Sequence, residues 1–387
     1  MMPTPTDPPQ KVVYVLGAGF SKPAGAPSQD EILGEILQLG EANGRVSEAK
    51  RNLREFLSGD LNLDIEHPER IALEDIYTPI DRCIADGTSL KGRTSANLSE
   101  LREHLGGLIS RAISAAIARH FAGNTGSSGY VHDFASYVVA KAARRGALAA
   151  SAASSALAKG YDPLSIISLN WDILLDSAIH ESLFRQCPKQ GDYDAFGVVD
   201  YCCYVSSLDP GDSRIRPGLW SLGCRGYNVK LLKLHGSLNW LQCPNCQRLF
   251  VDFGSKTEIL EHVGKTPCRH CGRFGYRHAL AGSLVMPTFL KDRSNFQIKL
   301  VWQNAGVELL EAKRLVFIGY SLPHADFEFR QLLSRMTHRA AAIDVVLHKE
   351  SSPQRYDAEV DRYRQFFGRR ELTFHQSGVI DFVSSLR

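Results

Sequence analysis

Four of the nine cysteines form two C-x-x-C pairs, a spacing that places both sulfur atoms of a pair within reach of one metal ion. Two such pairs complete the tetrahedral shell that structural zinc prefers, and a shell filled by sulfur leaves no open position for catalysis. We therefore predict a structural zinc site, with His262 and His270 as alternative ligands. The predicted ligands are Cys243, Cys246, Cys268 and Cys271.

Four apolar segments with the character of buried strands each end in a polar or glycine-bearing motif. In an open α/β sheet, ligands bind beyond the carboxyl ends of the strands. We therefore expect the four motifs to meet in one site. The motifs are GAGFS (17–21), NWD (170–172), HGS (235–237) and GYS (319–321).

The small residues of the first motif would let the backbone approach a pyrophosphate, which N–H groups at a helix N-terminus can bind. Gly17, Ala18 and Gly19 would supply the backbone groups, and Ser21 could add a hydroxyl. Lys22 stands where the dinucleotide fingerprint G-x-G-x-x-G has its third glycine, and no acidic residue ends a second strand about 20 positions later. By itself the motif is compatible with a ligand loop or with a plain tight turn.

The other motifs carry side chains that can donate, accept or transfer protons. Asp172 precedes an apolar-periodic helix, so it is suited to capping that helix, to holding a ligand, or to both. Asn170 has no comparable structural role. A lone histidine is usually a satisfied surface or core residue, but His235 directly follows an apolar strand and precedes a glycine, which shifts the interpretation toward a general base or an orienting group.

The elements that position these residues follow from hydrophobic periodicity. Apolar runs that alternate with helical patterns are typical of a mostly parallel sheet covered on both faces, which places the chain in the α/β class. Residues 45–150 have mainly helical periodicity and predict a helical insertion that caps the sheet. The predicted strands are 11–16, 164–169, 229–234, 315–318, 343–347 and 372–375.

Composition excludes several classes of protein. The 387 residues are 44% hydrophobic and 22% charged, close to the globular average, so the chain is not disordered as a whole. The formal charge of +3 gives no reason to expect direct nucleic-acid binding. No apolar run reaches the length of about 20 residues that a membrane span needs. The polar N-terminus lacks signal-peptide character, and the cysteine pattern indicates metal binding before disulfides, so we expect a cytoplasmic protein.

Taken in order, the motifs resemble the sirtuin family. GAG-x-S is followed by Gly25-Ala26-Pro27, then by N-x-D, HG, the two C-x-x-C pairs and G-x-S, over residues 11 to about 350. The resemblance implies a Rossmann-like, mostly parallel sheet with a helical insertion and a small zinc-ribbon module. It also implies that NAD lies in the cleft between them and that its nicotinamide–ribose bond is cleaved.

The resemblance also divides the chain into parts. The helical insertion would span 45–159 and the zinc-ribbon module 236–281. Residues 1–10, which precede the resemblance, are expected to be a disordered tail from their polar, Pro-rich sequence. The Rossmann-like NAD-binding domain would comprise 11–44, 160–235 and 282–387.

Carried over by position, the resemblance assigns roles to individual residues. Asn170 would lie against the ribose on the nicotinamide side, and His235 would be the catalytic histidine, so these two are the candidate catalytic residues. Asp172 joins the NAD-binding set, and Gly319 and Ser321 would contact the adenosine half. The NAD phosphates would be held by Gly17, Ala18, Gly19 and Ser21.

Three departures from the deacylases of this family bear on the activity. Leu169 stands where those enzymes have the Gln of TQN-x-D, and Ser28-Gln29-Asp30 replaces an acidic-Phe-Arg segment. The valine-bearing acyl-lysine cleft sequence is not recognisable in SLVMPTFLKDRS. The segment GYSLPHADFEFRQLL instead resembles the divergent bacterial sirtuin-like branch, whose members typically hydrolyse NAD in antiviral defence.

The sequence therefore favours an NAD⁺ glycohydrolase that releases nicotinamide and ADP-ribose. The alternatives are an NAD-dependent protein deacylase and a non-catalytic sensor of NAD or ADP-ribose. Because a destructive hydrolase has to be restrained, we expect a homo-oligomer and a separately encoded defence partner such as an ATPase or helicase. NAD as substrate and structural zinc are the expected ligands.

Overall fold

The computed structural model describes most of the chain. The tail predicted at 1–10 lies outside the described residues, and so does His262. The described residues are 11–40, 44–123, 128–151, 163–186, 197–217, 226–253, 263–291, 295–348 and 353–386.

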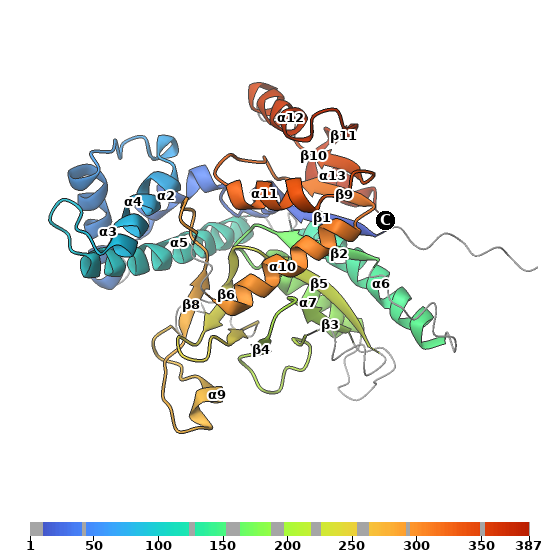
Figure 1. The fold of residues 1–387 in the computed structure, drawn as a ribbon, viewed down its shortest axis with the longest axis horizontal. Helices are drawn as coiled ribbons and strands as arrows, with labels where there is room; N and C mark the ends of the chain where they lie inside the picture. Colours follow the sequence, from blue (N-terminus) through green and yellow to red (C-terminus); the bar gives the residue numbers. More distant parts are fainter. Residues whose placement is uncertain are drawn as a thin grey trace, which may run out of the picture.

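A seven-stranded parallel sheet forms the centre of the molecule, in the order β11-β10-β9-β1-β2-β5-β3 (Figure 1). The chain leaves β1 toward β2 on one side and later returns to β9 on the other side. This is the order of a doubly wound Rossmann-like sheet with β3 added at the edge, which confirms the predicted fold class. The strands are β1 (Val12–Leu16), β2 (Leu164–Ser168), β3 (Gly197–Asp200), β5 (Tyr227–Lys233), β9 (Arg314–Ile318), β10 (Ala342–Val346) and β11 (Leu372–His375).

All six predicted strands are present within about two residues of their expected bounds. Central strands of a parallel sheet are covered on both faces, so they read as continuous apolar runs. Val13, Val15, Ile166, Ile167 and Leu231 accordingly have no exposed surface. The edge strand β3 was not predicted, because four residues are too few to show a period.

Helices pack on this sheet and share its hydrophobic cluster. Helix α6 contacts α7, α13, β2 and β5, whereas α10 contacts β5 and α11. Among the described helices, none has the length and apolar character that crossing a membrane would require. The helices of this layer are α6 (Gly129–Ser151), α7 (Leu174–Gln186), α10 (Phe296–Glu311), α11 (Phe327–Met336), α12 (Pro353–Phe367) and α13 (Gly378–Ser384).

A second hydrophobic cluster lies in the helical module formed by α2 to α5, at the left of Figure 1. Ile32 and Ile36 place α2 in this cluster, although α2 was expected in the Rossmann-like part. Phe134 places α6 on the sheet, although α6 was expected in the insertion at 45–159. The apolar face of each helix determines which hydrophobic cluster it joins. The bounds expected for the helical insertion and the Rossmann-like domain stay a prediction. The elements are α1 (Ala18–Ser21), η1 (Lys22–Ala24), α2 (Gln29–Gln38), α3 (Gly44–Glu55), η2 (Phe56–Asp60), η3 (Pro68–Arg70), α4 (Leu73–Asp86) and α5 (Ser95–Gly123).

A separate four-stranded sheet, ordered β4-β7-β6-β8, carries the cysteine pairs. The pairing is parallel between β4 and β7 and antiparallel elsewhere. Leu241, Phe250 and Leu280 pack around the cysteines as a third small core. The sheet takes in β4, which precedes the predicted module. Its elements are β4 (Val205–Ser207), β6 (Gly236–Gln242), β7 (Leu249–Val251), β8 (Ala281–Leu284) and the short helix α9 (Arg269–Gly272).

Candidate functional site

A cavity of about 630 Å³ lies at the carboxyl ends of the central strands, with the helical module as its other wall. Small-molecule sites usually measure about 300–1,000 Å³, and this position is the switch point of a doubly wound sheet. The structure thus brings residues of all four strand-end motifs together around one cavity, while their functional roles stay predictions. The predicted site residues that line it are Gly17, Ala18, Gly19, Ser21, Asn170, Asp172, His235, Gly319 and Ser321.

The glycines of the first and last motifs pack against each other. A Cβ on Gly17 would lie 2.6 Å from the carbonyl oxygen of Gly319. A Cβ on Gly19 would lie 2.8 Å from the Cα of Gly319. The Gly17 N–H donates to the Ile318 carbonyl (3.1 Å), and the Gly19 N–H donates to the Gly319 carbonyl (2.8 Å). These glycines therefore make room for the turn after β9, a role that the sequence did not reveal, while the predicted contact with a pyrophosphate stays a prediction. Ala18 begins α1, so its N–H has no intrahelical acceptor and stays suited to an anion.

Asn170 connects the end of β2 to the first motif. Its side-chain Nδ2 donates to the Gly17 carbonyl (2.9 Å) and to Ser21 Oγ (3.1 Å). Ser21, which is buried, also hydrogen-bonds the Asp172 carboxylate. The Asn170 amide and the Ser21 hydroxyl therefore hold the wall of the cavity together, a structural role that the sequence did not reveal.

Asp172 supports the start of α7 from just outside the N-cap position. The helix begins at Leu174, and the Ile173 carbonyl accepts its first intrahelical hydrogen bond, from the Ser177 N–H, so Ile173 is the N-cap residue. Its Oδ1 accepts from the Leu174 N–H at 3.1 Å, and Lys233 Nζ donates to its backbone carbonyl at 2.6 Å. Burial raises the pKa of Asp172 above its ordinary value, although the Lys233 charge and the Ser21 hydrogen bond act in the opposite direction. Asp172 is also among the residues that line the cavity, so supporting the helix start and contacting a ligand are compatible.

His235 follows β5, the direct neighbour of β2 in the sheet, so it and Asn170 lie at adjacent strand ends. Its Nδ1 lies 3.2 Å from the Leu169 carbonyl. Because a carbonyl only accepts, Nδ1 carries the proton and Nε2 carries the lone pair. Burial and the nearby Lys291 ammonium lower the pKa of His235 to about 4, although the negative charge of Asp326 acts to raise it. The ring is therefore neutral at pH 7. Nε2 can act as a base once the Lys291 ammonium moves away from it.

Two charged residues of the cavity, Lys291 and Asp326, were missed by sequence reasoning. Lys291 Nζ lies 2.9 Å from Asp326 Oδ1 and 3.3 Å from His235 Nε2, and Tyr320 donates its hydroxyl to Asp326 Oδ2 at 3.1 Å. Burial alone would raise the pKa of Asp326, but interactions with His235, Lys291 and Tyr320 lower it overall. Lys291 lies in an irregular segment and Asp326 directly precedes α11, so no local pattern distinguishes them.

The helical module contributes a buried acid to the same cavity. Glu74, in the first turn of α4, accepts a hydrogen bond from Gln29 Nε2 at 2.7 Å. Burial raises the pKa of Glu74, and the Gln29 hydrogen bond opposes the shift in part. Ile32, Ile71 and Ile113 form an apolar part of this wall. The sequence placed none of these residues at the site, because the approach of the module to the sheet is a tertiary feature.

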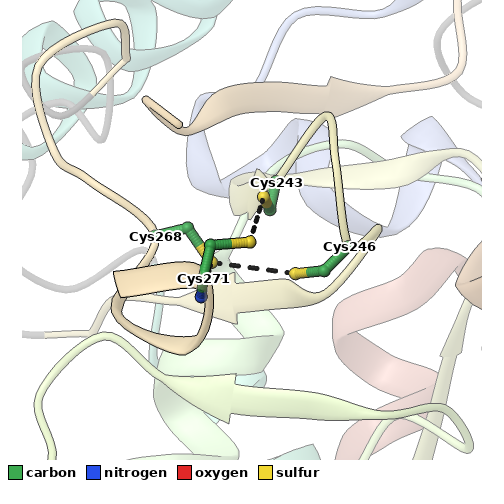
Figure 2. A group of neighbouring side chains, drawn as sticks. All are labelled: Cys243, Cys246, Cys268 and Cys271. Atoms are coloured by element: carbon green, nitrogen blue, oxygen red, sulfur yellow. Dashed lines mark hydrogen bonds between the residues drawn. The ribbon is translucent and has the colours of Figure 1, made fainter. Parts of the chain in front are cut away.

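The four cysteines of the small sheet converge, as Figure 2 shows. Their sulfur atoms all lie within 4.8 Å of one another, with 3.7 Å between Cys243 and Cys271 and between Cys246 and Cys268. Four clustered sulfurs from two C-x-x-C turns fit a tetrahedral zinc ion, and the set leaves no position for a substrate. The predicted ligand set is therefore a cluster compatible with structural zinc. His270 is outside the cluster.

No protein-family model matches the chain, and no curated protein matches it in sequence. Among solved structures, the chain is similar to a Sir2 homologue in complex with NAD, with 14% identity and a TM-score of 0.38 over 97% of this chain and 91% of the other. It is similar to a Sir2 homologue mutant in complex with ADP-ribose, with 14% identity and a TM-score of 0.39 over 97% and 90%. Likenesses at this level carry no argument about ligand or activity, so the site has to be interpreted from its own geometry.

Proposed function

We propose that this chain binds NAD in the cavity and hydrolyses the nicotinamide–ribose bond, giving nicotinamide and ADP-ribose. The observation that carries the proposal is His235, a buried imidazole on the cavity wall whose Nδ1–H is held by the Leu169 carbonyl. Its pKa of about 4 keeps the ring neutral at pH 7. A neutral imidazole has a free nitrogen lone pair that can accept the proton of an attacking water.

The proposed reaction balances with water as the second substrate. The bond between C1′ of the ribose and the nicotinamide nitrogen breaks, and its electron pair leaves with nicotinamide. The ribose passes through an oxocarbenium-like state before water forms the new bond to C1′. The proton released by that water passes to Nε2 of His235. Asn170 would orient the ribose or the water from the neighbouring strand end.

The proposed pose of NAD follows the order of the lining residues. The nicotinamide-side ribose would lie near Asn170, Asp172 and His235. The phosphates would face the segment Gly17–Ser21. Ala18 is the first residue of α1, so its N–H would be the donor at that helix start. The adenosine half would lie beyond Gly319 and Ser321, toward the carboxyl end of β10.

Incubation of the purified protein with NAD, followed by chromatography for nicotinamide, tests the proposal. We expect nicotinamide release without any acyl substrate, and a loss of about 10²–10⁴-fold in rate for His235→Ala. His132→Ala is the matched control, because His132 lies on α6 outside the cavity and should leave the rate unchanged. An unchanged rate in His235→Ala would show that the histidine is structural.

The second candidate is an NAD-dependent deacylase, favoured by the apolar wall of Ile32, Ile71 and Ile113 beside the polar site. Adding an acetylated peptide separates the two activities. Nicotinamide release that depends on the peptide would favour the deacylase. NAD binding without any release would favour a non-catalytic sensor of NAD or ADP-ribose.

Our proposal extends to the setting in which the hydrolase acts. An enzyme that depletes NAD must be restrained, so we propose that it works as a homo-oligomer in the cytoplasm, as an effector of bacterial antiviral defence. A separately encoded ATPase or helicase is the kind of partner that could release the restraint. Light scattering of the pure chain tests the assembly, and co-purification from the native host tests the partner.

A further inference from the structure

Lys291 is a buried ammonium group in the candidate site, with a side chain that is only 3% exposed. It follows β8 and reaches two residues from other parts of the chain. Nζ lies 2.9 Å from Asp326 Oδ1 and 3.3 Å from His235 Nε2. A lysine is rarely buried unless a carboxylate pairs with it, and Asp326 supplies that partner.

The partners of His235 determine its tautomer. The Leu169 carbonyl accepts from Nδ1, so the ring proton is on that nitrogen. The Lys291 ammonium only donates, so the nitrogen that faces it, Nε2, must carry the lone pair. The Leu169 carbonyl can only accept a hydrogen bond and the Lys291 ammonium can only donate one. Together they keep the ring neutral, with the lone pair on Nε2.

We infer that Lys291 and Asp326 are positioning residues for His235: Lys291 keeps Nε2 in its proton-accepting form, and Asp326 anchors Lys291. The inference rests on the proposed function for its catalytic meaning. The 3.3 Å between Nζ and Nε2 leaves no room for an atom between them, so an oxygen nucleophile would have to displace Nζ from Nε2. That nucleophile would then give its proton to Nε2, and the charge left on the oxygen would face the displaced ammonium. Lys291 would thereby also favour the deprotonated nucleophile.

The charged groups around His235 come from several elements. Lys291 follows β8, and Asp326 lies at the start of α11, with its Oδ1 3.8 Å from Nε2. Glu328 of α11 lies 3.7 Å from Lys291, and Glu74 of the helical module interacts electrostatically with both Lys291 and Asp326. Lys291 disfavours a proton on His235, whereas Asp326 favours one. Replacing Lys291 by an uncharged residue should therefore raise the pKa of His235. Replacing Asp326 by an uncharged residue should lower it.

NMR titration of the His235 ring tests the inference without any need for activity. The signal is assigned by comparison with His235→Asn. We expect Lys291→Met to raise the pKa of His235 by about one to two units and Asp326→Asn to lower it further. Lys141→Met, which removes a lysine on α6 outside the cavity, is the control for a general loss of charge and should leave the titration unchanged.

The rate of NAD hydrolysis as a function of pH provides the second arm. Only neutral His235 accepts a proton, so the rate should fall below its pKa, and this acid limb should move to higher pH in Lys291→Met. If the wild type releases no nicotinamide, the proposed function fails, and the NMR titration still decides whether Lys291 controls the ring. An unchanged titration in both single variants would overturn the inference.

Either single variant removes the nearest opposite charge of a buried group, which could impair folding. The double variant Lys291→Met, Asp326→Asn removes both charges, so neither is left unpaired. Its His235 pKa should fall between those of the two single variants. A value outside that interval in the folded double variant would also overturn the inference.

Discussion

Replacing Gly319 by alanine should destabilise the fold, because this glycine is where the turns after β1 and β9 meet. Its φ is +60°, and a Cβ would overlap the backbone nitrogen of Phe20 and the carbonyl carbon of Gly19. A left-handed conformation costs a non-glycine residue about 1–2 kcal/mol, and overpacking against backbone that can yield only by moving a turn adds about 1–3 kcal/mol. The expected loss in the free energy of unfolding is therefore about 2–5 kcal/mol.

Urea denaturation followed by circular dichroism measures this loss, with Gly107→Ala as the matched control. Gly107 lies inside α5, and a Cβ there would meet no atom within 4 Å. Alanine in a helix interior is favoured over glycine, so the control should gain about 0.5–1 kcal/mol. If Gly319→Ala unfolds within about 0.5 kcal/mol of the wild type, the close approach of the two turns is not needed, and the structural role given to these glycines is wrong.

Three further predictions concern the metal, the strand-end network and pH. Cys243→Ser should lose zinc and stability together, as measured by metal analysis and thermal unfolding, since structural zinc contributes about 10 kcal/mol or more to folding. Cys83→Ser, outside the cluster, should keep the metal, and zinc retained in both variants would contradict the site. Asn170→Ala should cost about 1–3 kcal/mol of stability, because it removes the hydrogen bonds to Ser21 Oγ and to the Gly17 carbonyl, which keeps only the Phe20 N–H as donor, so an unchanged denaturation midpoint would refute the network. The pKa of His235 is about 4 in the folded state and about 6.5 unfolded, so between these pH values only the unfolded chain binds the proton. Stability should therefore fall by about 3 kcal/mol as pH drops from 6.5 to 4, and His235→Gln should remove that part of the slope.

The sequence by itself determines the features that depend on neighbouring residues. Buried strands such as Val12–Leu16 are apolar runs in the sequence, and the spacing of the C-x-x-C pairs predicts which four cysteines cluster. The polarity of an α/β sheet then places Asn170 and His235 at one edge. Each of these conclusions needs only a local pattern and a general rule of topology.

Only the tertiary structure decides which distant groups meet. Lys291 is 56 residues from His235, and Gly319 approaches Gly17 and Gly19 from the far end of the chain. No period or spacing encodes such contacts, because they depend on how the strand ends converge and on how the helical module closes over them. The sequence could therefore name a candidate base, whereas the burial and the charges that set its pKa, and the packing of Gly319 against Gly17 and Gly19, required the three-dimensional fold.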